Sequence, residues 1–506
     1  MRTLPKTPQT CSHPRPQQKA TLLGLFASAA LGFATSINAA SVPDQTERIE
    51  DYRVLTEKIV KERAATPEDE ILRFAGLIRS SVKVNPWNAW KDQQTKSVII
   101  SAAIQHPDWS SSYAGVDYAK AIADETKGTL LPQLSGGVDY GDRQFGANPI
   151  TRSTLTKYTS TSMQLNVKQL LYDGFSRWDA WKSTEQKAEA QKLRAEIQQS
   201  EVILKLLEAS LNKQRFELQK YWVLKFNDQR KKTVDKIIKR YNLGASTIYE
   251  IARSELKTHD AGVSLEQIDQ QYKNAISIAQ EFDLPFDLNL PSIAEAVTNN
   301  DSELEQIIAQ HPVLKEAELL VASAQLELVS AQSRRTAPQV NLELYRGGRD
   351  FNGYSQNTND SSMLVTLTHN LYSGGSDTAK LTQASARLMQ MKDDMSSRQK
   401  TLRTTLIKTG ADVNALLSAL KYRQAAVDAS VAGFAATSKL FEINRGNLTD
   451  FQRVEDDLNE KVRMLIDNWF DLSISYFRHL HVSNTLKARF MSPYKLEAQS
   501  QLKPAL

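Results

Sequence analysis

The side chains best suited to chemistry in this chain form no recognisable catalytic or metal-binding pattern. His479 and His481 are the only closely spaced histidines, and residues two apart on a helix face different ways, so they are poorly placed to share a metal ion. The sequence contains no HExxH motif, no phosphate-binding glycine loop and no nucleophile elbow. We therefore predict that the protein is not an enzyme and that it uses no cofactor.

The charge distribution gives no indication of nucleic-acid binding. The 506 residues include 63 Lys and Arg against 58 Asp and Glu, for a formal net charge of +5. Basic blocks at 230–232 and 236–240 fall within a helical pattern, which is typical of a solvated helix face, and no nucleic-acid-binding motif accompanies them. We expect no nucleic-acid partner.

The first 40 residues are predicted to be a signal peptide. Basic residues precede a short apolar run at 20–34, and Ala39-Ala40 offers a cleavage point. The only cysteine, Cys11, lies before that run, so the mature chain is expected to have no disulfide. No later stretch approaches 18 apolar residues, so any membrane crossing must be made by strands.

An internal duplication organises the rest of the chain. Three motifs recur in the same order 200 to 206 residues later: Gln105-His106-Pro107 as Gln310-His311-Pro312, Leu131-Pro132-Gln133-Leu134 as Ala337-Pro338-Gln339-Val340, and Leu170-Leu171-Tyr172-Asp173-Gly174 as Asn370-Leu371-Tyr372-Ser373-Gly374. Helical solenoids repeat every 20–50 residues, so this period indicates a duplicated unit of domain size. The predicted divisions are an N-terminal extension of uncertain structure (41–95), a first repeat (96–283), a linker (284–292), a second repeat (293–487) and a polar C-terminal tail (488–506).

Each repeat contains two segments in which apolar and polar side chains alternate. The four segments begin near Leu134, Met163, Val340 and Met363, and each is about 9–12 residues long, the length of a tilted membrane strand. Alternation alone would also fit a sheet on a soluble core. Aromatic residues at the strand exits favour the membrane, since such rings suit a membrane–water interface; these are Tyr172, Trp178, Trp181 and Tyr372. Ordinary core packing remains the alternative for the two tryptophans.

Four strands cannot close into a membrane-spanning barrel. An open edge in lipid leaves backbone groups unpaired at several kcal/mol each, and single-chain outer-membrane barrels have at least about eight strands. If these strands span a membrane, several chains must share one barrel.

Very long helices follow the strands in both repeats. After Gly174 no proline or glycine occurs until Gly244, which leaves room for a helix of about 60 residues or more. The equivalent stretch of the second repeat is interrupted only by Gly410 and Gly433. Apolar residues spaced by three, four and seven predict coiled-coil packing between these helices.

Each long helix is predicted to reverse at a glycine turn, at Gly244 and at Gly446. We expect each glycine to adopt the left-handed conformation that ends a helix. Ser246 and Thr449 are the expected N-caps of the return helices.

Taken together, these features resemble the TolC family of outer-membrane export ducts, over about residues 95–487. The resemblance rests on the repeat, on the Leu-Pro-Gln-Leu and Ala-Pro-Gln-Val strand openings, on the Leu-Tyr-Asp-Gly and Leu-Tyr-Ser-Gly exits, and on the Arg-Tyr-Asn-Leu-Gly turn. It implies a mainly α fold with membrane β structure: a homotrimer whose chains contribute four strands each to one β-barrel in the outer membrane, continued by a long α-helical coiled-coil tunnel into the periplasm.

The resemblance also implies partners and a site. The partners would be outer-membrane lipid, a periplasmic adaptor that docks at the helix turns near Gly244 and Gly446, and an inner-membrane ABC or proton-driven pump of a type I secretion or efflux complex. Members of the family have an acidic constriction near the second turn. Matching from the glycine places Gln452 and Glu455 at the acidic positions, whereas matching from the acidic run implies a two-residue deletion and places Asp450 and Arg453 there.

Three copies of a carboxylate around an axis would repel one another, favour cations and narrow the passage. The alternative reading of these acidic residues is a helix start favoured by the helix dipole. For the whole chain, the alternative is a periplasmic coiled-coil adaptor or scaffold. Such adaptors normally carry one hairpin and a membrane anchor, so two hairpins joined to four membrane-length strands favour the duct.

Overall fold

The computed structural model describes residues 67–145, 156–283, 290–298, 300–352, 358–443 and 445–491. All of them belong to one compact unit, Ile49–Leu506. The predicted signal peptide lies outside the described residues, as do most of the predicted linker and most of the predicted C-terminal tail. No helix within the described ranges is long and apolar enough to cross a membrane.

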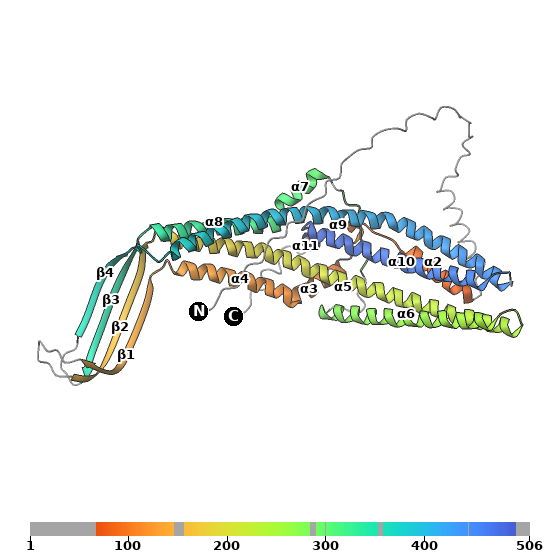
Figure 1. The fold of residues 1–506 in the computed structure, drawn as a ribbon, viewed down its shortest axis with the longest axis horizontal. Helices are drawn as coiled ribbons and strands as arrows, with labels where there is room; N and C mark the ends of the chain where they lie inside the picture. Colours follow the sequence, from red (N-terminus) through yellow and green to blue (C-terminus); the bar gives the residue numbers. More distant parts are fainter. Residues whose placement is uncertain are drawn as a thin grey trace, which may run out of the picture. The chain divides into compact units, whose positions relative to one another are not determined.

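The order of elements repeats, as the sequence predicts (Figure 1). The described part of the chain begins with α2 (Pro67–Ser81), the short 3-10 helix η1 (Trp87–Ala89) and α3 (Gln93–Gln105). The first repeat continues through α4 (Pro107–Gly128), β1 (Gln133–Phe145), β2 (Thr156–Tyr172), α5 (Ser176–Asn242) and α6 (Ile248–Glu281). The second contains α7 (Asp301–Gln310), α8 (Pro312–Thr336), β3 (Gln339–Asn352), β4 (Thr358–Thr368), α9 (Ser376–Glu442) and α10 (Leu448–Val482), and α11 (Leu486–Met491) follows it. The predicted class, mainly helical with four strands per chain, is confirmed.

The four strands form one antiparallel sheet in the order β1-β2-β3-β4. The two hairpins join through β2 and β3, where Leu165 lies opposite Arg346. Three strands are longer than predicted, at 13, 17 and 14 residues for β1, β2 and β3. The prediction followed the apolar alternation, but backbone pairing continues into polar segments because ladder hydrogen bonds do not require apolar side chains.

The apolar side chains of the sheet are not covered by the helices of the chain. Val138, Met163, Met363 and Leu367 are each 63–69% exposed. Within the described residues β1 and β4 each pair on one side only. A single chain therefore has an exposed apolar surface, which is typical of contact with protein or lipid, and two sheet edges that can pair with further strands.

The two long helices have equal lengths of 67 residues, about 100 Å each at 1.5 Å per residue. Helix α5 packs along α4, α8, α6 and α10, and α9 packs along α8 and α10. Gly410 and Gly433 do not interrupt α9. Residues at the predicted coiled-coil spacing form the core, among them Val427, Phe434 and Leu465, which are fully buried.

The two helix turns differ from each other. Gly244 has a φ of +74°, as predicted for a left-handed helix end. The same prediction is wrong for Gly446, which has no positive φ; glycine is needed there because a Cβ would lie 2.9 Å from the backbone nitrogen of Phe441. The predicted N-caps are also displaced, to Thr247 and Asn447.

The local reason for the first displacement is a capping box. The Thr247 hydroxyl accepts a hydrogen bond from the Glu250 backbone (3.3 Å), and the Glu250 carboxylate accepts one from the Thr247 backbone (3.0 Å). At the second turn the Asn447 side chain accepts from the backbone of Thr449 (3.0 Å). At both turns a side chain thus satisfies at least one backbone donor at the start of the return helix.

The ends of the described chain are packed into the helical body. Helices α2 and η1 lie in the predicted N-terminal extension, to which sequence analysis assigned no structure. Phe490, in the predicted polar tail, is fully buried, and its ring lies 5.2 Å from that of Trp87. Residues that lie more than 400 positions apart therefore share one aromatic cluster.

Candidate functional site

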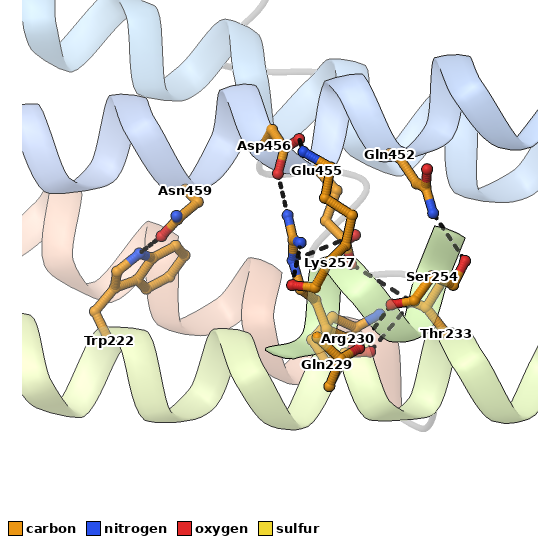
Figure 2. Close-up of polar contacts among 11 residues, drawn as sticks. Trp222, Gln229, Arg230, Thr233, Ser254, Lys257, Gln452, Glu455, Asp456 and Asn459 are labelled. Carbon is orange, nitrogen blue, oxygen red and sulfur yellow. Dashed lines mark hydrogen bonds and ion pairs between the residues drawn. The ribbon is translucent and has the colours of Figure 1, made fainter. Parts of the chain in front are cut away.

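A group of polar side chains lies between α5, α6 and α10 (Figure 2). Its centre is Arg230 of α5, which is 5% exposed. The guanidinium donates to the backbone carbonyl of Lys257 on α6 (2.7 Å) and pairs with the carboxylate of Asp456 on α10. One cation therefore contacts all the helices that meet here.

Glu455 lies beside Arg230 and is 2% exposed. Its carboxylate is 3.8 Å from the Arg230 Nε and accepts a hydrogen bond from the Thr233 hydroxyl (3.4 Å). Burial raises the pKa of Glu455 to about 7, and the nearby Arg230 opposes that rise only in part. This carboxyl group consequently titrates near neutral pH.

Three further contacts tie α10 to its neighbours. The Gln452 amide donates to the Ser254 hydroxyl on α6 (2.8 Å), and the Lys257 ammonium pairs with Asp456 (3.1 Å). The indole of Trp222 on α5 donates to the side chain of Asn459 (2.9 Å). The start of α10 is thus held to the first helical hairpin, formed by α5 and α6, by side-chain polar contacts as well as by apolar packing.

The structure separates the candidate aperture residues into two groups. Gln452 and Glu455 lie on the buried face of α10, between the helices of one chain. Asp450 and Arg453 lie on its exposed face. The helical period accounts for this division, because Leu448, the two buried polar residues and Leu458 follow a spacing of three and four.

Apolar side chains are exposed at both helix turns. Leu243 is 83% exposed, and Ile248 and Tyr249, at the start of α6, are also exposed. At the second turn Leu440 and Ile443 are exposed. Clustered apolar residues at the ends of helical hairpins mark a surface suited to contact with other apolar side chains.

The predicted interface aromatics gather where the strands meet the helices. Tyr172, Trp178 and Tyr372 are exposed, whereas Trp181 is half-buried. The rings of Trp178 and Trp181 form an edge-to-face pair at 4.8 Å, and the Lys182 ammonium lies 4.3 Å from the centre of the Trp181 ring. Amphipathic rings beside a cation have the chemistry of a boundary between apolar and aqueous surroundings.

Sequence analysis missed Arg230, because block 230–232 was interpreted as a solvated face. Lys231 is indeed exposed, but Arg230 is buried. A signal was available: Trp222, Phe226 and Arg230 follow one another at intervals of four, so Arg230 continues an apolar stripe.

The histidine pair behaves as its spacing predicts. The His479 side chain contacts the Thr409 hydroxyl on α9 (3.0 Å), whereas the His481 side chain contacts the Ser200 hydroxyl on α5 (2.9 Å). Burial lowers the pKa of both histidines. Within the described ranges no group of three His, Cys, Asp or Glu side chains is arranged to hold a metal ion.

In sequence, the chain is similar to outer membrane proteins. Residues 304–464 match the model of the outer membrane efflux protein family. Outer membrane protein TolC of Salmonella enteritidis is 24% identical over 418 residues, which cover 74% of this chain and 79% of that protein.

Two solved structures have a similar fold. The CmeC outer membrane channel of Campylobacter jejuni matches with a TM-score of 0.70 at 12% identity, over 82% of this chain and 92% of that one. The outer membrane protein VceC of Vibrio cholerae matches with a TM-score of 0.67 at 15% identity, over 78% and 98%.

Proposed function

Because this chain belongs to the family of outer-membrane efflux proteins that includes TolC, we propose that three copies assemble into one water-filled conduit from the periplasm to the cell exterior. Each chain contributes its four strands to a shared barrel in the outer membrane. The long helices continue the conduit into the periplasm. The protein acts as a passive duct and carries out no covalent chemistry.

The sheet is the observation that carries this proposal. Its apolar side chains are exposed, and β1 and β4 each lack a partner on one side within the described residues. Pairing β1 of one chain with β4 of the next would satisfy both edges, and the apolar side chains would then face lipid. Tyr172, Trp178, Trp181 and Tyr372 would lie at the inner boundary of the membrane.

The helix turns are proposed as the docking surface for a periplasmic adaptor, which links the duct to an inner-membrane ABC or proton-driven pump. The turns at Gly244 and Gly446 present Leu243, Ile248 and Ile443 to solvent. Such apolar tips suit the helical hairpin of a partner. Cargo would be selected by the pump, in a type I secretion or an efflux complex.

Among the candidate aperture residues, Asp450 is the one that we propose to face the passage. It is acidic and exposed near the start of α10, whereas the carboxyl group of Glu455 and the amide of Gln452 are engaged between helices. Three Asp450 side chains around the axis would favour cations and narrow the opening.

The proposal is tested by the native mass of the protein extracted from outer membranes in detergent, with the detergent subtracted. A mass near three mature chains, together with heat-modifiable migration on a gel, is the expected result. A monomer extracted from the membrane would leave the strands unable to close and would overturn the proposal. A soluble periplasmic species would instead support an adaptor-like scaffold.

A further inference from the structure

Helix α2 lies against three other helices, α5, α9 and α10. Its inner face is apolar and buried, since Ile71, Leu72, Ala75 and Ile78 are all at most 3% exposed. The Phe74 ring contacts Tyr221 edge-to-face (4.8 Å) and stacks on Trp222 (6.0 Å), both on α5. A segment that precedes the first repeat therefore fills a groove between the two helical hairpins.

The polar contacts of α2 connect it to both hairpins. Near its first turn, Glu70 pairs with Lys225 of α5 (2.6 Å). Near its last turn, Arg79 donates to Asp428 of α9 through Nη2 (2.8 Å) and Nε (3.1 Å). The helix is therefore bound at one end to the first hairpin and at the other to the second.

The segment after α2 is anchored to the body of the protein. The carbonyl of Val82 accepts from Gln424 of α9 (3.1 Å), and the carbonyl of Lys83 accepts from the Trp469 indole of α10 (3.3 Å). Asn85 forms a parallel bridge with Ile293.

Farther along, the rings of Trp87 and Trp90 pack on Phe490 at 5.2 and 5.7 Å. The backbone nitrogen of Trp87 also donates to the Glu295 carboxylate (2.8 Å). If α2 leaves its groove, these contacts keep the segment that follows it attached to the body of the protein.

We propose that residues 67–90, which we call the strap, are a built-in restraint that holds the α9–α10 hairpin against the α5–α6 hairpin, and that α2 must leave its groove before the conduit opens at the helix-turn end. The inference rests on the proposed function for its consequence, the opening of a conduit. The contact between strap and hairpins is a feature of one chain.

The strap is suited to release. A helix of 15 residues is marginal alone in water, so its packing in the groove must supply its stability. Gly76, in its interior, weakens the helix further, and exposed ion pairs such as Glu70–Lys225 contribute little. The groove therefore binds a helix of low intrinsic stability, which can detach and rebind while residues 82–90 stay anchored.

Two neighbouring residues allow a matched test. Ile78 is 2% exposed and Leu77 is 62% exposed on the same helix. Ile78→Asn should free α2, whereas Leu77→Asn makes the same kind of change on the solvent face. Gly76→Ala should strengthen the strap, because a Cβ there meets no atom within 4 Å and alanine favours the helix.

The experiment measures hydrogen exchange and single-channel conductance of the full-length, detergent-extracted protein. Ile78→Asn should speed exchange in α2 and at the start of α10 by tenfold or more, and should raise the fraction of time that the channel is open. Leu77→Asn should match the wild type. Gly76→Ala should slow exchange in α2 by about fivefold and lower the open fraction.

If α2 exchanges quickly in Ile78→Asn while α10 and the conductance stay unchanged, the strap restrains nothing and the inference fails. If Ile78→Asn does not assemble, the test uses Arg79→Asp, Asp428→Arg and the double variant instead. Each single change should speed hydrogen exchange at the start of α10, and the double variant should return it to the wild-type rate. Equal effects of the single and combined changes would overturn the inference. If the wild type does not conduct, the proposed function fails, and exchange at the start of α10 still tests the restraint.

Discussion

Replacing Glu455 with glutamine should remove a pH dependence from the packing of α5, α6 and α10. The native pKa of this carboxyl group is about 7, against an ordinary value of 4.5, because burial disfavours its charged form. Each tenfold change in an acid dissociation constant corresponds to about 1.4 kcal/mol. Proton binding at Glu455 should therefore make the free energy of unfolding about 3 kcal/mol larger at low pH than at high pH.

The sign follows from proton binding. Between pH 4.5 and 7 the native state holds a proton on Glu455 that the unfolded state has lost. The stabilisation is complete below pH 4.5, falls as the pH rises and is lost above pH 7. The groups facing Glu455 divide in their effect: Arg230 and Lys257 lower its pKa, whereas Asp456 raises it. A residue that is neutral at every pH, as in Glu455→Gln, should keep α10 docked above pH 7.

Hydrogen exchange of peptides from the start of α10, measured from pH 5 to 8 and corrected for intrinsic exchange rates, provides the assay. Wild-type protection should fall with rising pH and level off above 7, whereas Glu455→Gln should stay level. Asp457→Asn is the matched control, because that carboxylate is exposed two residues away. A pH slope that persists in Glu455→Gln, or that disappears in Asp457→Asn, would refute the reasoning.

Three further predictions concern the same end of the molecule. Arg230→Met should destabilise the docking of α10 by about 1–3 kcal/mol, because it leaves the Lys257 carbonyl without its donor and the buried Glu455 and partly exposed Asp456 without their cation, whereas Lys231→Met should have little effect on thermal unfolding. Gly244→Ala should cost about 1–2 kcal/mol through its positive φ, and Gly446→Ala should be worse in the same thermal assay because its methyl group would meet the α9 backbone. Asp450→Ala should raise conductance and weaken cation preference in planar bilayers; unchanged values would remove this residue from the aperture.

Features that depend on local chemistry could be predicted from the sequence. The absence of proline and glycine between Gly174 and Gly244 predicts one uninterrupted helix, and α5 spans 67 residues. The two His-Pro motifs also have the same structure. His106 and His311 each cap a helix by accepting a backbone hydrogen bond at 3.2 Å, with proline in the first turn that follows.

Features that depend on tertiary packing were less accessible. Gly446 occurs in the sequence context of a helix-ending glycine, but its role comes from the approach of its backbone to α9, which sequence spacing does not reveal. Helix α2 was missed for another reason. Its apolar residues Ile71, Leu72, Ala75 and Ile78 follow the helical period, yet without a repeat counterpart nothing indicated what they would pack against.

The asymmetry between the two hairpins has a consequence for any symmetric opening. In the proposed trimer, threefold symmetry would make the three chains equivalent, so differences around the assembly would have to come from differences within one chain. The first turn has a left-handed glycine and a capping box, whereas the second has neither; instead, α10 brings the buried Glu455 against Arg230. An opening that keeps the symmetry and moves the second hairpin against the first must break the α5–α10 contacts within each chain. The buried ionisable pair and the strap both act on this one interface, so the resistance to opening is built into the single chain before any assembly forms.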